Sequence, residues 1–179
     1  MKKYRFGVLV AAWIVAGVLM IAGAQTGEGK AEFARTTIDL GAVVSDIDEA
    51  TEFYTEAIGF EQVGSFDVSA ELAEATGLTD AKPFQVRVFA LGKEPTATKL
   101  KLMEIPGAGS KPIDNEYISS SLGFSYLTIV VADLDEAMAR LEREGVSPVK
   151  PPYKLGGNRY LILVKDPDGN IVELIGPKK

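Results

Sequence analysis

Apolar and polar residues alternate along two short segments that each lead directly into a helical pattern. The first segment spans residues 38–44 and the second spans residues 126–131, with an apolar residue at every second position. A period of two is that of a strand with one face against a helix layer and the other face turned elsewhere. We therefore expect a strand in each segment.

Each of these strands is followed by a helix with its own start and stop signals. Asp46 and Asp133 can accept the free amide hydrogens of a first helical turn, and a glutamate follows each of them three positions later. Gly59 and Gly145 stand where a left-handed C-cap ends a helix. The apolar stripes are Ile47, Ala50, Phe53, Tyr54, Ala57 and Ile58 in the first helix, and Leu134, Ala137, Met138 and Leu141 in the second.

The same order of elements occurs twice along the chain. Segments 41–50 and 128–137 read GAVVSDIDEA and TIVVADLDEA, identical at six of ten positions with an offset of 87. Further strands are expected at 60–66, 84–91, 99–105, 146–150, 160–164 and 170–175, with an extra short helix at 68–77. The pattern predicts one α+β domain at 36–178. Its two βαβββ modules span 36–106 and 123–176, with a linker at 107–122.

The first 24 residues have the layout of an export signal. Three basic residues precede an apolar run at 6–21, and the small residues Ala22, Gly23 and Ala24 come just before a polar stretch. This order is typical of a signal peptide at 1–24, here followed by a linker at 25–35. The alternative is an uncleaved membrane anchor, because residues 6–24 are just long enough to cross a bilayer. We expect an exported protein, periplasmic or extracellular, that contacts a membrane only if this segment is retained.

The composition limits how the domain can be stabilised and which classes of partner it can bind. The chain has no cysteine, so a buried core must stabilise the domain without disulfides. Its net charge is −6, and removal of the three basic residues within 1–24 leaves −9. An acidic domain without a basic stripe argues against nucleic acid and against an anionic membrane surface as partners.

Two motifs near the ends of the domain resemble those of a known superfamily. Segment 52–60 reads EFYTEAIGF and segment 166–174 reads DPDGNIVEL. Together with the strand–Asp–helix openings, they resemble the vicinal oxygen chelate superfamily of glyoxalases, bleomycin-resistance proteins, extradiol dioxygenases and methylmalonyl epimerase. The resemblance covers 36–176 and implies curved mixed sheets around a cavity, with helices outside. Because this scaffold hosts many chemistries, the resemblance is specific for fold and much less so for activity.

The resemblance also points to the positions of a metal site. Metal enzymes of the superfamily place a His on the first strand of each module, seven residues before the helix-capping Asp, and a Glu on the last strand. The matching positions are Asp39, Lys101, Tyr126 and Glu173. Only Glu173 keeps the expected residue type, and the chain contains no histidine. A three-residue shift with a bulge would place Glu104 at the ligand position instead of Lys101, and this alternative stays open.

These residue types change the chemistry that the resemblance implies. A protonated lysine has no lone pair, so it repels a divalent ion instead of binding it. We therefore expect no metal and no other cofactor, and an Asp39–Lys101–Glu173 ion-pair cluster in their place. Lys101 could orient an acidic or carbonyl-bearing small molecule with Tyr126 as a hydrogen-bond donor. Lys101 and Glu173 are also the candidates for acid–base catalysis.

One further strand carries polar residues whose direction the sequence leaves open. At 84–88, Phe84, Val86 and Val88 alternate with Gln85 and Arg87. If the apolar residues face the helices, Gln85 and Arg87 face the cavity.

Several functions remain open on the sequence alone. The preferred one is small-molecule binding of the bleomycin-resistance type, with Asp39, Lys101, Tyr126 and Glu173 lining the cavity. The alternatives are a metal-independent lyase or isomerase of the glyoxalase/epimerase type, a metal-dependent enzyme with unusual ligands, and a partner-binding module whose pocket is packed. The sequence does not decide between binding and turnover, nor whether two copies form a homodimer.

Overall fold

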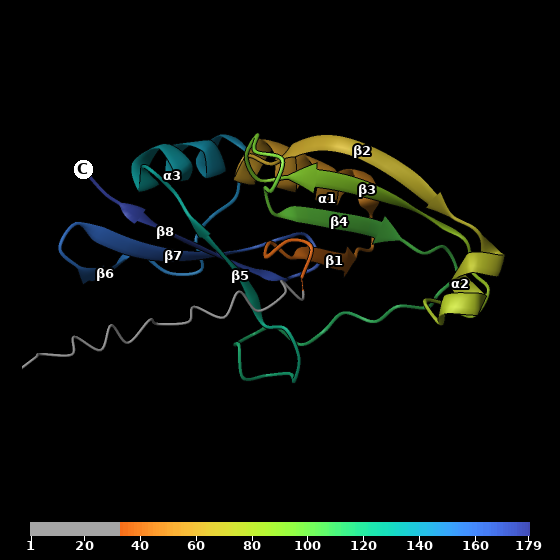
Figure 1. Cartoon of the computed structure of the whole chain (residues 1–179). Coiled ribbons are helices and arrows are strands. Elements are labelled where there is room, and N and C mark those ends of the chain that lie inside the picture. The colour runs from red at the N-terminus through yellow and green to blue at the C-terminus, as the bar shows by residue number, and fades with distance from the viewer. Residues whose placement is uncertain (1–32) are drawn as a thin grey trace, which may run out of the picture. The chain divides into compact units, whose positions relative to one another are not determined.

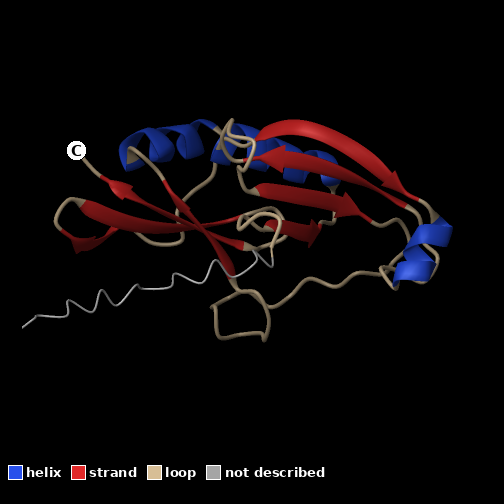
Figure 2. Ribbon diagram, viewed as in Figure 1, coloured by secondary structure: helices blue, strands red, loops and turns tan. Residues whose placement is uncertain are grey.

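The structure, a computed structural model, describes residues 33–179, of which residues 35–179 form one compact unit (Figures 1 and 2). The expected signal peptide at 1–24 lies outside the described residues. Within residues 33–179, no helix is long and apolar enough to cross a bilayer. The elements in chain order are β1 Asp39–Val43, α1 Ile47–Glu52, η1 Phe53–Ile58, β2 Glu61–Val68, α2 Ala70–Thr76, β3 Phe84–Ala90, β4 Lys99–Glu104, β5 Tyr126–Val130, α3 Leu134–Arg143, β6 Tyr153–Gly156, β7 Arg159–Lys165 and β8 Ile171–Pro177.

The strands form two four-stranded sheets with the same internal order. The first sheet runs β1-β4-β3-β2 and the second runs β5-β8-β7-β6. In each sheet the first strand pairs parallel with the last strand of its module, and the other pairs are antiparallel. This order confirms the predicted α+β fold of two βαβββ modules.

The strand registers of the two modules also correspond. Gly41 of β1 lies opposite Lys101 of β4, and Thr128 of β5 lies opposite Glu173 of β8. Gly41 and Thr128 are the residues that begin the two copies of the sequence repeat. Lys101 and Glu173 therefore occupy equivalent positions in their sheets.

The helices begin and end as their sequence signals predict. The Asp46 carboxylate accepts hydrogen bonds from the amides of Asp48 and Glu49 at 2.9 and 3.0 Å, and Asp133 caps α3 in the same way. The first helix changes at Phe53 into a π-helical turn, η1, which ends at Gly59 with a φ of 97°. The extra short helix is also present as α2, with Ser69 as its N-cap.

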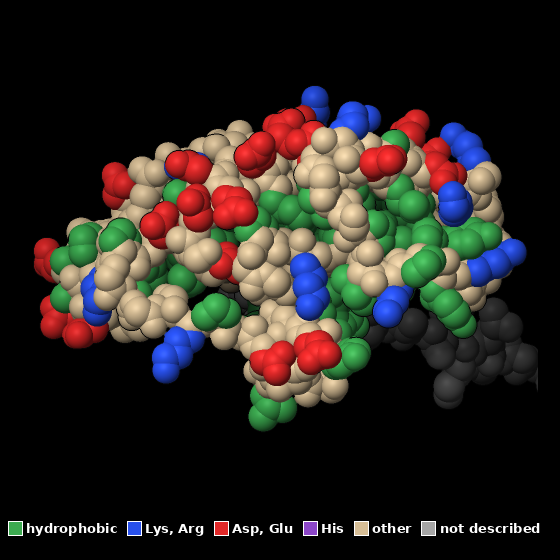
Figure 3. All heavy atoms as spheres, turned by 180° about the vertical axis from the view of Figure 1, so that it is seen from behind, with side chains coloured by type: hydrophobic (Ala, Val, Ile, Leu, Met, Phe, Trp, Pro, Cys, Tyr) green, Lys and Arg blue, Asp and Glu red, His purple; other side chains and the backbone are tan. Residues whose placement is uncertain are grey.

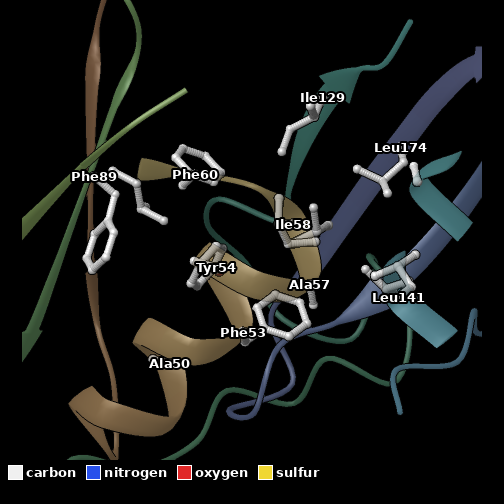
Figure 4. Packing of buried hydrophobic residues seen from close by; sticks show 14 of the residues in the cluster. Ala50, Phe53, Tyr54, Ala57, Ile58, Phe60, Phe89, Ile129, Leu141 and Leu174 are labelled. Atoms are coloured by element: carbon white, nitrogen blue, oxygen red, sulfur yellow. The ribbon is translucent and has the colours of Figure 1, made fainter. Parts of the chain in front are cut away.

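One main core joins the two modules through their helices. Figure 4 shows the helix that carries Tyr54 and Ile58 between Phe89 of the first sheet and Leu141 and Leu174 of the second module. All five side chains are at most 4% exposed. The faces of the sheets that contact these helices are thereby buried, and the opposite faces remain for a site.

Residues 146–150 do not form the strand that their apolar pattern predicts. Pro148, Pro151 and Pro152 lack the amide hydrogen that a strand ladder requires. Val149 donates one hydrogen bond to the Leu163 carbonyl oxygen at 2.8 Å, and regular pairing with β7 begins only at Tyr153. The second strand of this module is therefore β6, which is short and lies further along the chain than predicted.

Candidate functional site

The four candidate residues lie on the sheet faces that turn away from the main core. On β4, Leu100 and Leu102 pack into the core, so Lys101 between them points to the opposite face. Glu173 lies between core residues of β8 in the same way. We call the face of the first sheet that carries Asp39 and Lys101 the Lys101 face, and the face of the second sheet that carries Tyr126 and Glu173 the Glu173 face.

Two cations converge on one carboxylate on the Lys101 face. Asp39 Oδ2 lies 3.0 Å from Lys101 Nζ and 2.7 Å from Arg35 Nη2. The Arg35 hydrogen bond and then the Lys101 hydrogen bond hold the pKa of Asp39 below its ordinary value. Arg35 precedes β1 in irregular backbone, so no strand or helix period connected it with Asp39 in the sequence.

The second oxygen of Asp39 has a different environment. Asp39 Oδ1 is buried and accepts no hydrogen bond from any residue within 33–179. The side chain as a whole is 14% exposed. A buried acceptor without a donor costs free energy, so this atom calls for a hydrogen-bond donor.

On the Glu173 face, the carboxylate of Glu173 is hydrogen-bonded to a hydroxyl group and not paired with a cation. Thr128 donates its Oγ1 hydrogen to Glu173 Oε1 at 2.8 Å. Tyr126, two residues earlier on β5, is 50% exposed, and Val130, two residues later, is 71% exposed. This face is thus open to solvent, with apolar and aromatic groups around one carboxylate.

Among the four candidates, only Asp39 and Lys101 are joined by an ion pair within residues 33–179. Among the described residues, no hydrogen bond or ion pair joins Asp39 or Lys101 to Tyr126 or Glu173. The expected three-residue ion-pair cluster is therefore present only as the Asp39–Lys101 pair. Two hollows of about 490 and 470 Å³ lie beside the β2–α2 corner and on α3, and neither is lined by any of the four candidates.

The surface of the molecule also carries exposed hydrophobic side chains. Figure 3 shows hydrophobic side chains exposed across the middle of one side of the molecule, with acidic side chains along the margin formed by the helices. The exposed apolar residues of the described chain include Val43 on β1 and Phe66 on β2. The segment between β4 and β5 adds Leu122 and Phe124, which are fully exposed.

Glu104, the alternative to Lys101, lies on the other side of the sheet. Its Oε2 accepts a hydrogen bond from the amide of Ile47 at 3.3 Å, at the start of α1. Lys101, and not Glu104, is the register counterpart of Glu173.

The expectation that Gln85 and Arg87 face the cavity is wrong. Arg87 lies under α1, where it donates to Thr51 Oγ1 at 3.0 Å and pairs with Asp48 at 2.7 Å. The apolar residues in the first half of β3 face the other way, because α2 covers that end of the Lys101 face. There Phe84 and Val86 pack with Val68 and Ala73 in a second small core.

The residues at the superfamily's ligand positions do not fit a divalent ion. The Lys101 ammonium contacts the carboxylate that would have to bind the metal, and an ammonium group has no lone pair to donate. Within residues 33–179, no three carboxylates lie close enough together to hold a metal ion.

Comparisons with known proteins agree with the fold. A lactoylglutathione lyase of Arabidopsis thaliana is 26% identical over 133 residues, which are 74% of this chain and 41% of that protein. The chain thus spans less than half of that relative's length. A glyoxalase family protein from Bacillus cereus has a TM-score of 0.68 at 19% identity, covering 83% of this chain and 99% of the other. Glyoxalase I of Leishmania major has a TM-score of 0.55 at 24% identity, covering 79% and 86%.

The sequence pattern of one superfamily matches most of the chain. The match extends over residues 35–174, which include nearly all of both modules and all four candidate positions. The two sheets with their parallel β1–β4 and β5–β8 pairs carry that pattern in three dimensions. This chain therefore belongs to the Glyoxalase/Bleomycin resistance protein/Dioxygenase superfamily.

Proposed function

We propose that the chain is an exported small-molecule-binding protein whose ligand is acidic or carbonyl-bearing and contacts Lys101. The observation that carries the proposal is the Asp39–Lys101 pair at 3.0 Å, where Lys101 is the register counterpart of Glu173. An ammonium held at this position supplies a positive charge to an incoming anion or carbonyl oxygen. The export rests on the layout of residues 1–24 alone.

We further propose that Tyr126 and Glu173 contact the ligand from a second copy of the chain. The support is that no hydrogen bond or ion pair within residues 33–179 joins them to Asp39 or Lys101, together with the solvent exposure of the Glu173 face. Tyr126 and Val130 are half or more exposed there, and burial against a partner would remove that apolar surface from water. A homodimer would then bring one Lys101 face and one Glu173 face together around each ligand.

The second candidate function is a metal-independent lyase or isomerase. Its support is Glu173, whose carboxylate is fixed by Thr128 at 2.8 Å and remains accessible to a substrate carbon acid. Lys101 would then stabilise the negative charge that forms on a carbonyl oxygen. Turnover by the wild-type protein separates this function from binding alone.

The test is Lys101→Met, which keeps most of the length of the side chain and removes its charge. With 4-methylpentanoate and 2-oxo-4-methylpentanoate as probes, we expect calorimetric binding to the wild type and loss of most of it in the variant. Lys150→Met is the matched control and should bind as the wild type does, because Lys150 is exposed and forms no ion pair with any residue within 33–179.

If neither probe binds the wild-type protein, or if Lys101→Met binds both unchanged, the proposed function is wrong. Turnover of the 2-oxo acid by the wild type that collapses in Lys101→Met would favour the lyase or isomerase instead. Analytical ultracentrifugation with and without ligand tests the homodimer separately, since a monomer at both conditions would contradict it.

A further inference from the structure

A hollow of about 490 Å³ lies at one end of the first sheet, where α1 begins, β2 leads into α2 and β4 ends (Figure 1). Its volume is in the range of pockets that hold small molecules. Glu104 lines it and accepts a hydrogen bond from the first amide of α1, so the hollow includes the helix side of the sheet. None of the four candidate residues lines it. It is therefore a different place from the proposed site.

Three polar residues of the hollow form a row across three strands. Asp67 of β2 lies opposite Gln85 of β3, and Gln85 lies opposite Glu104 of β4. The Gln85 side chain donates a hydrogen bond to Asp67 Oδ1 at 3.3 Å. Neighbouring strands are about 4.8 Å apart, so the backbones that carry the two carboxylates are about 10 Å apart. The row thus has a negative charge at each end and a neutral amide between them.

No cation of the described chain offsets these two carboxylates. Within residues 33–179, neither Asp67 nor Glu104 forms an ion pair, and no lysine or arginine lines the hollow. Arg87 lies on the same side of β3 as Gln85 but pairs with Asp48 at 2.7 Å. Glu104 is half-buried, where water and salt screen its charge less than at the surface. The hollow therefore attracts a cation and repels an anion.

The other residues that line the hollow are mostly apolar. They include Ile47, Val68, Pro83, Phe84 and Pro106. An aliphatic chain in the hollow would remove part of this apolar surface from water, whereas an inorganic ion would leave it exposed. The lining thus fits a ligand that combines positive charge with a hydrocarbon chain.

From this lining we propose that the hollow binds a linear aliphatic diamine. One ammonium group contacts Asp67, the other contacts Glu104, and the methylene chain between them lies across Gln85. Each ammonium group is a donor of three hydrogens, and its hydrogen bonds to a carboxylate are stronger than neutral ones. A metal ion fits less well, because Ca²⁺ and Mg²⁺ take six or more oxygen ligands and no group of three metal-ligating side chains occurs within residues 33–179.

The test compares ligands of similar length that differ in charge. They are 1,4-diaminobutane, 1,5-diaminopentane, 1-aminobutane and 1,4-butanediol, measured by calorimetry with the wild-type chain at low ionic strength. At least one diamine should bind about tenfold more tightly than the monoamine, because it makes a second charge-assisted contact. The diol, which has no charge, should show no binding.

Asp67→Asn and Glu104→Gln then assign the two contacts to their residues. Each substitution keeps the size of the side chain and removes one charge, so each should weaken diamine binding about tenfold, close to the affinity of the monoamine. Glu71→Gln is the control, since Glu71 is exposed on the nearby α2 and does not line the hollow. It should bind the diamine as the wild type does. Thermal unfolding checks that the variants fold, and the wild-type series decides if one does not.

Three results would overturn the proposal. The first is that no diamine binds more tightly than the monoamine. The second is that Glu71→Gln weakens diamine binding as much as the other two variants, since the diamine would then respond only to overall charge. The third is that just one of Asp67→Asn and Glu104→Gln weakens it, which would mean a single ammonium contact. None of these results bears on the proposed function, whose probes are acids that contact Lys101.

Discussion

A buried tyrosine and a buried carboxylate link the two modules at the residue scale. Tyr54 on η1 donates its hydroxyl hydrogen to Asp166 Oδ2 at 2.9 Å. Asp166, in the turn before β8, also accepts hydrogen bonds from the Asn170 amide at 2.7 Å and the Asn170 side chain at 2.9 Å. Burial raises the pKa of Asp166, and burial together with the nearby Asp166 charge raises the pKa of Tyr54 far above its ordinary value.

We expect Tyr54→Phe to lower the free energy of unfolding by about 1–3 kcal/mol, because it removes a donor from a buried carboxylate. The effect should also depend on pH. A raised folded-state pKa means that the Tyr54 contribution is complete below pH 10.0, the ordinary value, and is lost as the pH rises above it. Urea unfolding at neutral pH and near pH 11 measures both parts.

The matched control is Tyr153→Phe, since Tyr153 is 70% exposed. It should change the unfolding free energy little at neutral pH. If the two variants lose the same stability, the buried hydrogen bond does not link the modules as described.

The sequence predicted the sheet faces on which the candidate residues lie better than it predicted the contacts that they make. Asp39, Lys101, Tyr126 and Glu173 all lie on the faces away from the helices, as the period of two and the resemblance imply. Arg35 was missed because it contacts Asp39 from irregular backbone. The role of Asp166 was missed because a turn motif does not reveal which distant side chain will contact it.

At the scale of elements, Arg140 of α3 holds the end of η1 in the other module. Its Nε donates to the Ala57 carbonyl oxygen at 2.9 Å and its Nη2 to the Ile58 carbonyl oxygen at 2.6 Å. These are carbonyls of the last helical turn, which otherwise lack partners. The chain then turns at Gly59, directly beside the Arg140 guanidinium.

We expect Gly59→Ala to lower the unfolding free energy by about 2 kcal/mol. An alanine at position 59 would have to adopt a φ of 97°, which strains the backbone. Its Cβ would lie 3.3 Å from Arg140 Cζ and displace the guanidinium group. Gly145→Ala, at a φ of 70° with no neighbour within 4 Å, should cost only about 1 kcal/mol from backbone strain. Chemical denaturation compares them, and equal losses would mean that Arg140 does not stabilise this junction.

Two elements differ from their prediction for identifiable physical reasons. Residues 146–150 read as an apolar strand, but the prolines around them remove the amides that pairing requires. The direction of β3 was misjudged because its apolar residues suggested contact with the main helices. They are instead covered by α2, while Arg87 bonds to α1. Local pattern could not show which of two helices covers which face.

At the scale of the whole molecule, the two modules share one strand arrangement, but their candidate site residues differ. Lys101 and Glu173 hold equivalent register positions, yet one contacts the carboxylate of Asp39 and the other the hydroxyl group of Thr128. The strand framework therefore does not depend on which residues stand at the site. This explains why the fold could be predicted from the repeat, whereas the ligand requires the side-chain geometry.

We propose that an ion pair and an organic anion take the place of a metal at these positions. The most direct test of this proposal is the metal content of purified protein, measured by elemental analysis after incubation with Ni²⁺, Zn²⁺, Fe²⁺ and Mn²⁺ and removal of the excess. We predict far less than one metal ion per chain, because the Lys101 ammonium contacts the Asp39 carboxylate that would have to bind it. One tightly bound ion per chain that is lost in Glu173→Ala would contradict this proposal.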